Sequence, residues 1–183
     1  MPTPLRLLSL EDNESDLQLI LLELQEAGFE PQWERVQTER DFVERLDQNL
    51  DIILADYSLP QFDAMKALRS RNERGVDVPF IIVSGSIGED IAVAAMQEGA
   101  ADYVLKDRLG RLGQAVTRAL EQKRLTTERK RAEQALLESD ARMRIVTDNA
   151  RVGLVMVNQE RRYIFANATY TCSGHDQHEW NFG

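Results

Sequence analysis

The sequence predicts an α/β fold in which helices wrap a parallel sheet and one long helix follows. Short apolar runs alternate with amphipathic segments of helical length over residues 1–110, which is the order expected of such a sheet. Two runs, residues 52–55 and 80–83, are apolar at every position, as strands are when both faces are covered. Residues 109–143 contain no proline and are rich in Arg, Glu, Gln, Ala and Leu, so they favour a helix.

Five strands and four enclosed helices account for the first part of the chain. The apolar runs place the strands at Leu5–Leu10, Gln32–Val36, Asp51–Ala55, Phe80–Val83 and Asp102–Leu105. The amphipathic segments place the helices at Asp16–Ala27, Thr38–Asp47, Asp63–Glu73 and Glu89–Glu98. The first helix has the clearest pattern, with Gly28 as its C-cap, and Gly99 marks the end of the fourth. The two fully apolar strands are expected at the centre of the sheet.

The run after Leu109 predicts a largely solvated helix that ends near Met143. Eight of the fourteen residues 121–134 are charged, and opposite charges recur three or four positions apart, which stabilises an exposed helix. A weak seven-residue pattern passes through Val116, Lys123, Lys130 and Leu137, with Ala119 and Thr126 offset by three. A coiled-coil dimer and a solvated connector therefore both remain open. DNA binding is disfavoured because no turn-helix signature accompanies these basic residues.

The last forty residues have a different pattern. Residues 153–157 and 163–166 are short apolar strands joined by the polar residues 158–161, which indicates a hairpin. The final ten residues show no helix or strand pattern. Because two strands alone are only marginally stable, we expect the chain to stop inside a domain.

Charge is distributed unevenly along the chain. The total of −9 divides into −12 over residues 1–110, +4 over 111–145 and −1 over 146–183. An acidic body argues against direct nucleic-acid binding, which needs a clustered basic surface. The apolar runs are far shorter than the roughly 18–20 residues of a membrane span, and the N-terminus has no signal-peptide pattern. With one cysteine, Cys172, no internal disulfide can form, so we expect a cytoplasmic protein with no membrane partner.

Five chemically complementary residues follow the predicted strands. In a parallel sheet the reactive crevice lies beyond the carboxyl ends of the strands, where the sequence places Glu11, Asp12, Asp56, Ser84 and Lys106. Clustered carboxylates repel one another unless a cation compensates, and an all-oxygen ligand set suits Mg²⁺. With Mg²⁺ and Lys106 offsetting negative charge, Asp56 could attack phosphorus and form an aspartyl phosphate. Any one of these residues alone would be read as a helix cap or a surface residue; the five together favour a shared site.

Residues 4–125 resemble the receiver domains of two-component response regulators. The motifs that match are Glu11-Asp12 after the first strand, Asp56 before Tyr57-Ser58-Leu59-Pro60, Ser84-Gly85, and Tyr103-Val104-Leu105-Lys106. The resemblance implies a doubly wound, flavodoxin-like five-stranded sheet with strand order 2-1-3-4-5. It implies Asp56 as phosphoacceptor, and Glu11, Asp12, Asp56 and the Ser58 backbone carbonyl as ligands of Mg²⁺ or Mn²⁺. Lys106 would contact the phosphoryl group, while Ser84 would swing toward it as Tyr103 turns inward.

Two positions depart from the family pattern. Asp107 stands where many receivers have a proline in a cis peptide after the lysine, and this leaves the isomer of that bond open. Ala64 stands where a glycine commonly follows the aspartate of the loop after the phosphoacceptor. Neither departure removes a chemical group from the site.

The expected organisation is a receiver at residues 1–125, an extended helix at 108–142 that could form a coiled coil, and a truncated segment at 143–183. This last segment resembles the opening of a PAS sensor domain, through Arg144-Ile145-Val146, Gly153-Leu154-Val155 and Phe165-Ala166-Asn167. Phosphorylation of Asp56 would switch the face formed by the fourth helix, the fifth strand and the last helix, and so control dimerisation or a downstream domain. The expected partners are a histidine kinase or phosphotransfer protein and a second copy of the chain.

Two other functions compete with this non-enzymatic signalling role. A phosphatase acting through its own aspartyl phosphate generally has a second aspartate two residues after the nucleophile, where this chain has Ser58. A binding scaffold that is never phosphorylated would not need Asp56, Lys106 and the acidic pair. A soft-metal site at Cys172, His175 and His178 is disfavoured because these residues lie in a polar segment without pattern.

Overall fold

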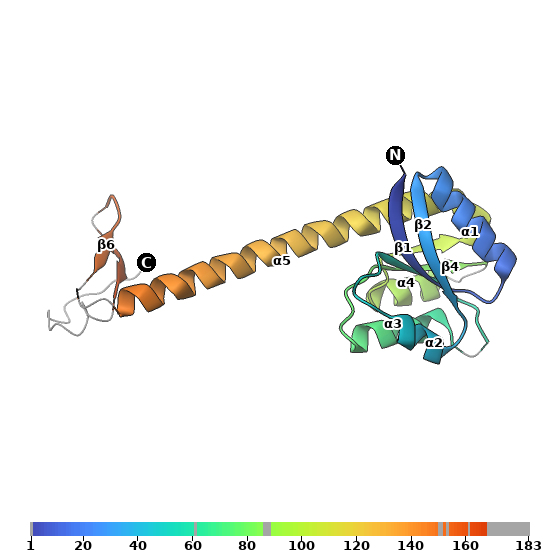
Figure 1. Cartoon of the computed structure of the whole chain (residues 1–183), viewed down its shortest axis with the longest axis horizontal. Coiled ribbons are helices and arrows are strands. Elements are labelled where there is room, and N and C mark those ends of the chain that lie inside the picture. The colour runs from blue at the N-terminus through green and yellow to red at the C-terminus, as the bar shows by residue number, and fades with distance from the viewer. Residues whose placement is uncertain are drawn as a thin grey trace. The chain divides into compact units, whose positions relative to one another are not determined.

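The computed structural model describes residues 2–60, 62–85, 89–149, 152, 154–160 and 162–167. They fall into two compact units, residues 1–126 and 127–183, which we describe separately. A five-stranded sheet with its helices forms the first unit, and a two-stranded sheet lies in the second. The long helix α5, Leu112–Asp148, begins in the first unit and ends in the second (Figure 1).

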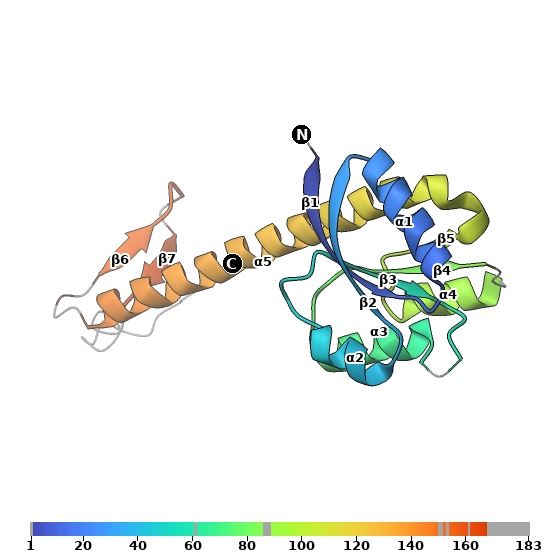
Figure 2. The same cartoon turned by 45° about the vertical axis from the view of Figure 1, so that its right-hand side comes forward.

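The sheet of the first unit is parallel throughout, with strand order β2-β1-β3-β4-β5; all five strands are labelled in Figure 2. Its strands are β1 Thr3–Leu10, β2 Phe29–Val36, β3 Ile52–Asp56, β4 Phe80–Ser84 and β5 Asp102–Leu105. The helices between them are α1 Glu14–Glu26, α2 Glu39–Arg45, α3 Ala64–Glu73 and α4 Glu89–Gln97. The predicted α/β class, the strand order and the central place of the two fully apolar strands are therefore confirmed.

Alternating residues of each strand build two cores, one on each face of the sheet. Helices α1 and α5 cover one face of the sheet, and α2, α3 and α4 cover the other (Figure 2). Leu5 and Leu7 of β1 belong to the core under α1 and the start of α5, and Leu8 and Leu10 belong to the core under α2, α3 and α4. The two faces follow from the period of two along a strand. All five residues of β3 and of β4 are buried, as strands covered on both sides must be.

The edge strand β2 is longer than its sequence pattern predicts. It begins at Phe29, three residues before the expected start at Gln32, and it includes Pro31. Proline has no backbone N–H to donate, and an edge strand has a neighbour on only one side. The position of proline can therefore face away from that neighbour without the loss of a hydrogen bond. Only Phe29 and Val36 of β2 are buried, which is why its apolar pattern was too weak to reveal the full length.

A 3₁₀ helix, η1 Lys106–Arg111, separates β5 from α5. The sequence prediction started the long helix at Leu109, but the regular α-helix begins at Leu112 and continues to Asp148 rather than ending near Met143. Helix α5 passes close to the C-cap of α1 at Gly113. A Cβ atom on Gly113 would lie 2.3 Å from the Cβ of Ala27, so the contact requires glycine.

The first part of α5 packs on the sheet and cannot form the predicted dimer seam. Val116 is fully buried and Ala119 is nearly so, both in the core shared with α1. The proposed pattern through Val116, Ala119, Lys123 and Thr126 is therefore wrong at its start. The physical reason is that α5 is buried along its first part and exposed farther on. Its apolar residues before position 120 pack into the core of the first unit and are not available to a second helix.

The second unit contains the C-terminal part of α5 and a hairpin of β6 Val155–Val157 with β7 Tyr163–Ala166. Asn167 is fully buried, and its Nδ2 donates to the Thr147 carbonyl at 2.6 Å and to the Val152 carbonyl at 3.0 Å. The predicted hairpin is present, although β6 begins two residues after residue 153. Cys172, His175 and His178 lie outside the described residues. Among the described helices, none is both long and apolar enough to cross a membrane.

Candidate functional site

The strands of the first unit end side by side and bring the predicted residues to one edge of the sheet. Leu10 pairs with Ala55, so Glu11 follows β1 beside Asp56. Asp56 pairs with Val83, the residue before Ser84, and Ser84 pairs with Leu105, the residue before Lys106. The sheet register thus gathers residues from four strands, as the topology predicts for the carboxyl edge.

The Lys106 ammonium lies at the centre of this group. Its Nζ donates to Asp16 Oδ2 at 2.6 Å, to Asp56 Oδ2 at 2.9 Å and to Glu11 Oε2 at 3.0 Å. An ammonium has three protons, so the three carboxylates use its whole donor capacity. Lys106 and Asp56 are mostly buried and Glu11 is almost fully buried, so water screens these ion pairs less than surface pairs.

Backbone N–H groups hold the other oxygens of the two buried carboxylates. The Ser58 amide donates to Asp56 Oδ1 at 3.2 Å, and the Asn13 amide donates to Glu11 Oε1 at 3.0 Å. Asp56 therefore has one oxygen toward Lys106 and one toward the loop after β3. Each of the two carboxylates accepts hydrogen bonds on both of its oxygens, which favours one fixed side-chain geometry.

Three carboxylates of this edge are close enough to bind one cation. Ligand oxygens of Glu11, Asp12 and Asp56 lie within 4.8 Å of one another, and Asp12 is exposed to solvent. Among the described residues, the site has one ammonium for the four carboxylates of Glu11, Asp12, Asp16 and Asp56, so negative charge is in excess. An all-oxygen, negatively charged and partly open set fits a hard cation such as Mg²⁺.

The pKa values of Glu11 and Lys106 are both raised, for different reasons. A raised pKa favours the neutral form of the acid and the charged form of the base. Burial raises the pKa of Glu11, against the lowering effects of the Asn13 amide and of Lys106. Burial alone would lower the pKa of Lys106, but the hydrogen bonds to Asp16, Asp56 and Glu11 outweigh it and raise this pKa. The lysine is thus held in its charged form, as a group that contacts an anion must be.

Of the predicted switch residues Ser84 and Tyr103, Ser84 lies at the carboxyl edge of the sheet, between the ends of β3 and β5. Ser84 is fully buried at the end of β4. Tyr103 lies in β5, packed against the core under α2, α3 and α4, and its hydroxyl is buried with no hydrogen-bond partner among the described residues. Burial, with a smaller contribution from the charge of Asp107, raises the pKa of Tyr103.

The two departures from the family pattern have simple structural outcomes. The described residues contain no cis peptide bond, so the bond between Lys106 and Asp107 is trans. Ala64 is the first residue of α3 after the N-cap Asp63, and it is fully buried in the core. Its methyl group therefore packs inside the protein.

Asp16 belongs to the site, although the sequence prediction treated it only as the start of a helix. Helix α1 begins two residues earlier, at Glu14, and this places Asp16 in its first turn. The spacing between Asp12 and Asp16 in the sequence is the signal that points to Asp16 as a site residue. Asp16 lies four residues after Asp12, and a helix that starts at the carboxyl edge of a sheet presents its first turn to that edge.

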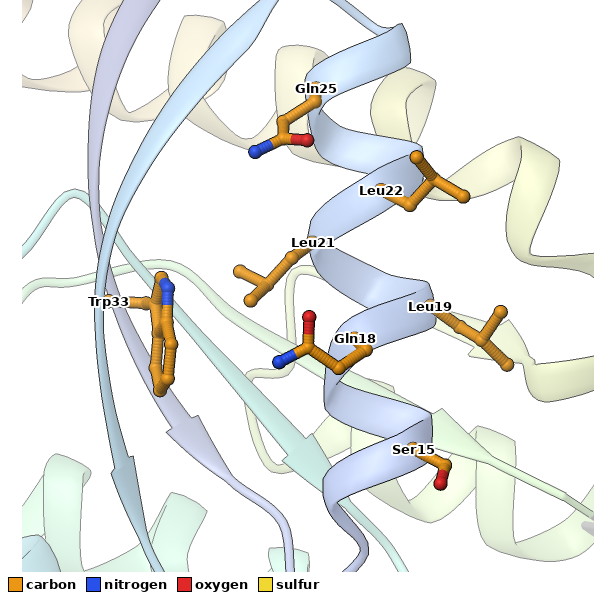
Figure 3. A pocket seen from close by; sticks show the side chains of 7 residues that line it. All are labelled: Ser15, Gln18, Leu19, Leu21, Leu22, Gln25 and Trp33. Carbon is orange, nitrogen blue, oxygen red and sulfur yellow. The ribbon is translucent and has the colours of Figure 1, made fainter.

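A groove that is lined by none of the site carboxylates lies between α1 and β2 (Figure 3). Its lining residues are Ser15, Gln18, Leu19, Leu21, Leu22, Gln25 and Trp33. Leu19, Leu22 and Trp33 are exposed. No titratable side chain lines the groove, so it offers none of the acid, base or nucleophilic groups found at the sheet edge.

Residues 7–117, more than half of the chain, match the family described as the response regulator receiver domain. The C4-dicarboxylate transport transcriptional regulatory protein DctD of Pseudomonas aeruginosa is 35% identical over 88 residues, which cover 48% of this chain and 19% of that protein. The regulatory protein AtoC of Escherichia coli is 31% identical over 119 residues, covering 59% and 26%. The chain thus spans about a fifth to a quarter of the length of these relatives.

Solved receiver structures match this chain over almost their whole length. A response regulator receiver domain protein from Clostridium thermocellum is 26% identical with a TM-score of 0.58, and the match covers 67% of this chain and 98% of that one. The beryllofluoride-activated NtrC4 receiver domain, solved as a dimer, is 25% identical with a TM-score of 0.56, and the match covers 64% and 98%.

Proposed function

The chain belongs to the response regulator receiver family, and on this premise we propose that it is a phosphoacceptor module in which a phosphoryl group is transferred to Asp56. The single observation that best supports the proposal is the position of Asp56. Its carboxylate lies between the Lys106 ammonium and two further carboxylates able to share a cation with it. The proposed organisation is a receiver at 1–125, a connecting helix at 108–142 and the start of a PAS domain at 143–183.

The proposed step is the attack of an Asp56 oxygen on the phosphorus of a donor. A new O–P bond forms, the bond from phosphorus to the donor's leaving group breaks, and the leaving group takes the electron pair. The Ser58 amide orientates one oxygen of Asp56, and Lys106 contacts the other before transfer. After transfer, the ammonium would follow the negative charge onto the phosphoryl oxygens.

Mg²⁺ or Mn²⁺ would be held by Glu11, Asp12, Asp56 and the Ser58 carbonyl, and when bound would offset the charge on the phosphoryl oxygens. Glu11 and Asp12 would keep this charge fixed beside Asp56. The donor would be a histidine kinase or a phosphotransfer protein, with phosphohistidine as the reacting group. Ser58 offers no carboxyl group two residues after Asp56, which disfavours turnover as a phosphatase.

The transmission of the signal would begin at Ser84 and Tyr103. The Ser84 hydroxyl would move toward the phosphoryl group, and Tyr103 would turn further into the space behind it. The buried Tyr103 hydroxyl supports this role, because a polar atom without a partner among the described residues gains a hydrogen bond when it moves. The movement would alter the face formed by α4, β5 and α5 and would thereby control dimerisation or a downstream domain.

Incubation of the wild-type protein with Mg²⁺ and acetyl phosphate is expected to add the mass of one phosphoryl group, and Asp56→Asn is expected to add none. The carboxamide of asparagine is too weak a nucleophile to attack phosphorus. Asp47→Asn is the matched control, because it makes the same change at an exposed carboxylate before β3, at the opposite edge of the sheet. Intact-mass spectrometry measures the adduct, and binding of beryllofluoride measured by ¹⁹F NMR is a second readout.

A wild-type protein that shows neither an Asp56-dependent adduct nor beryllofluoride binding would refute the proposal. That result would favour the alternative of a scaffold that works by binding alone. An adduct retained in Asp56→Asn would place the nucleophile elsewhere. Continued hydrolysis of a phosphomonoester, lost on Asp56→Asn, would revive the phosphatase interpretation.

The part of α5 from residue 125 onward is proposed to pair with the same helix of a second copy. Five of its exposed apolar residues fall on two series of positions that each repeat every seven residues, in a register different from the one predicted by sequence. Leu125, Ala132 and Val146 belong to one series, and Leu136 and Met143 belong to the other, whereas the exposed Leu137 and Ile145 lie outside both. A stripe with this period matches a second identical helix in a coiled coil. Arg129 and Ser139 occupy the remaining positions of the stripe, so we expect a weak dimer.

Leu136→Lys is expected to weaken the dimer at least roughly tenfold, because it places a charge in the apolar seam. Leu137→Lys is the matched control, since Leu137 is 59% exposed against 64% for Leu136 and lies one position outside the stripe. Sedimentation velocity over a range of concentrations, with and without beryllofluoride, measures the dissociation constant. Equal weakening by both substitutions, or by Leu137→Lys alone, would contradict this register.

A further inference from the structure

The first turn of α1 supplies a carboxylate to the site that stands apart from the cation-binding group. Asp16 Oδ2 lies 2.6 Å from Lys106 Nζ, which is closer than the oxygens of Asp56 or Glu11. Among the described residues, the carboxylates that can share one cation are Glu11, Asp12 and Asp56, and Asp16 is not among them. Two of the three partners of Lys106 thus also belong to the cation group, and the third does not.

The three partners of Lys106 would have different fates in the proposed reaction. The Asp56 carboxylate would carry the phosphoryl group, and Glu11 would turn to the cation, so both would withdraw from the ammonium. Asp16 would stay in place because it is part of α1. The helix is fixed at its start by Asn13, whose side chain accepts from the Ser15 amide, and by Leu17, which is buried in the core. A carboxylate in a first helical turn is also stabilised by the helix dipole.

We propose that Asp16 is a positioning residue that holds the Lys106 ammonium at the phosphoryl site when Asp56 and Glu11 are engaged. The inference rests on the proposed function and extends it to a residue outside the predicted site. Without Asp16, the flexible lysine would lose its remaining fixed acceptor and would sample positions away from the phosphoryl oxygens. The ammonium would then stabilise the bound anion less.

A purely electrostatic role for Asp16 predicts the opposite result. Removing one negative charge near the site would strengthen the binding of an anion and weaken that of a cation. A positioning role predicts weaker anion binding with little change in cation binding. The sign of the change in beryllofluoride affinity therefore separates the two roles.

The experiment compares Asp16→Asn with the wild type and with Glu14→Gln, in the full chain. Glu14→Gln removes a charge from the same helical turn at an exposed side chain, so it controls for charge and for the helix dipole. Asp16→Asn is expected to bind beryllofluoride roughly three- to tenfold more weakly in saturating Mg²⁺. Mg²⁺ affinity in the absence of beryllofluoride is expected to stay within about twofold of the wild type.

NMR of the Lys106 ammonium gives a readout independent of affinity. A held ammonium exchanges its protons slowly, so its ¹H–¹⁵N signal is expected in the beryllofluoride-bound wild type and in Glu14→Gln but not in Asp16→Asn. Asp16→Glu is expected to restore part of the signal and of the affinity. Unchanged or tighter beryllofluoride binding in Asp16→Asn, or a retained signal, would overturn the role of Asp16 alone. Absence of binding in the wild type would instead overturn the proposed function.

Discussion

Replacing Lys106 with methionine is expected to lower the free energy of unfolding by about 2–4 kcal/mol at neutral pH in the absence of divalent cations. Methionine keeps most of the volume of the side chain but removes the charge between Glu11, Asp16 and Asp56. Three carboxylates, two of them buried, would then repel one another. Urea unfolding followed by circular dichroism measures the change.

The same substitution should make stability depend on Mg²⁺ and on pH. Burial already raises the pKa of Glu11, and without the lysine one of the effects that lower this pKa is lost, so the folded-state pKa of Glu11 rises further above its unfolded value. A group raised in this way stabilises the fold at low pH and loses that contribution as pH rises through its folded pKa. The deficit of Lys106→Met should therefore shrink toward about pH 5 and grow toward about pH 8. Saturating Mg²⁺ should recover most of it, with roughly tenfold tighter Mg²⁺ binding than in the wild type.

Lys66→Met is the matched control for Lys106→Met. Lys66 is exposed on α3 and lies 3.7 Å from Asp63, in a pair of the kind that contributes about 0–1 kcal/mol. It should change stability little and should not alter Mg²⁺ binding. Equal stability of Lys106→Met and the wild type in metal-free buffer would show that the three carboxylates do not depend on the ammonium.

Replacing Arg71 with methionine is the second large effect, also expected at about 2–4 kcal/mol of unfolding free energy. The buried guanidinium of α3 donates from Nη1 to the Val78 carbonyl at 2.8 Å and from Nη2 to the Gly99 carbonyl at 3.0 Å. These carbonyls lie in the turns that precede β4 and β5. Methionine would fill the space but leave both carbonyls without these donors, and a lost partner costs more than the bond itself contributes.

Arg69→Met, two residues earlier on the same helix, separates this effect from the loss of an arginine as such. Arg69 forms an exposed ion pair with Glu98 at 2.7 Å, and such a pair contributes about 0–1 kcal/mol. Arg71→Lys should fall between wild type and Arg71→Met, because one ammonium cannot reproduce the planar fork of the guanidinium. Similar losses for Arg69→Met and Arg71→Met in chemical unfolding would contradict the structural role of the two buried carbonyls.

The pattern of apolar and polar residues was sufficient to predict an element where a residue's burial follows from its neighbours in sequence. The fully apolar runs at 52–55 and 80–83 predicted central strands, and the residues that follow each strand predicted one edge of the sheet. Pattern was insufficient for β2, an edge strand with two buried residues, and for the seam of α5. An apolar residue such as Val116 gives the same sequence pattern whether it packs against a second helix or in the core of its own unit, where the structure places it.

Strand period and residue chemistry are local properties, so the α/β class, the parallel order of elements and the groups that we propose to receive and hold a phosphoryl group follow from the sequence. Which carboxylates share Lys106 depends instead on tertiary contacts. Residues 11, 16, 56 and 106 meet through the register of four strands and the start of one helix. Asp16 became part of the site, and Val116 was removed from the dimer seam, because both outcomes depend on contacts between segments distant in sequence.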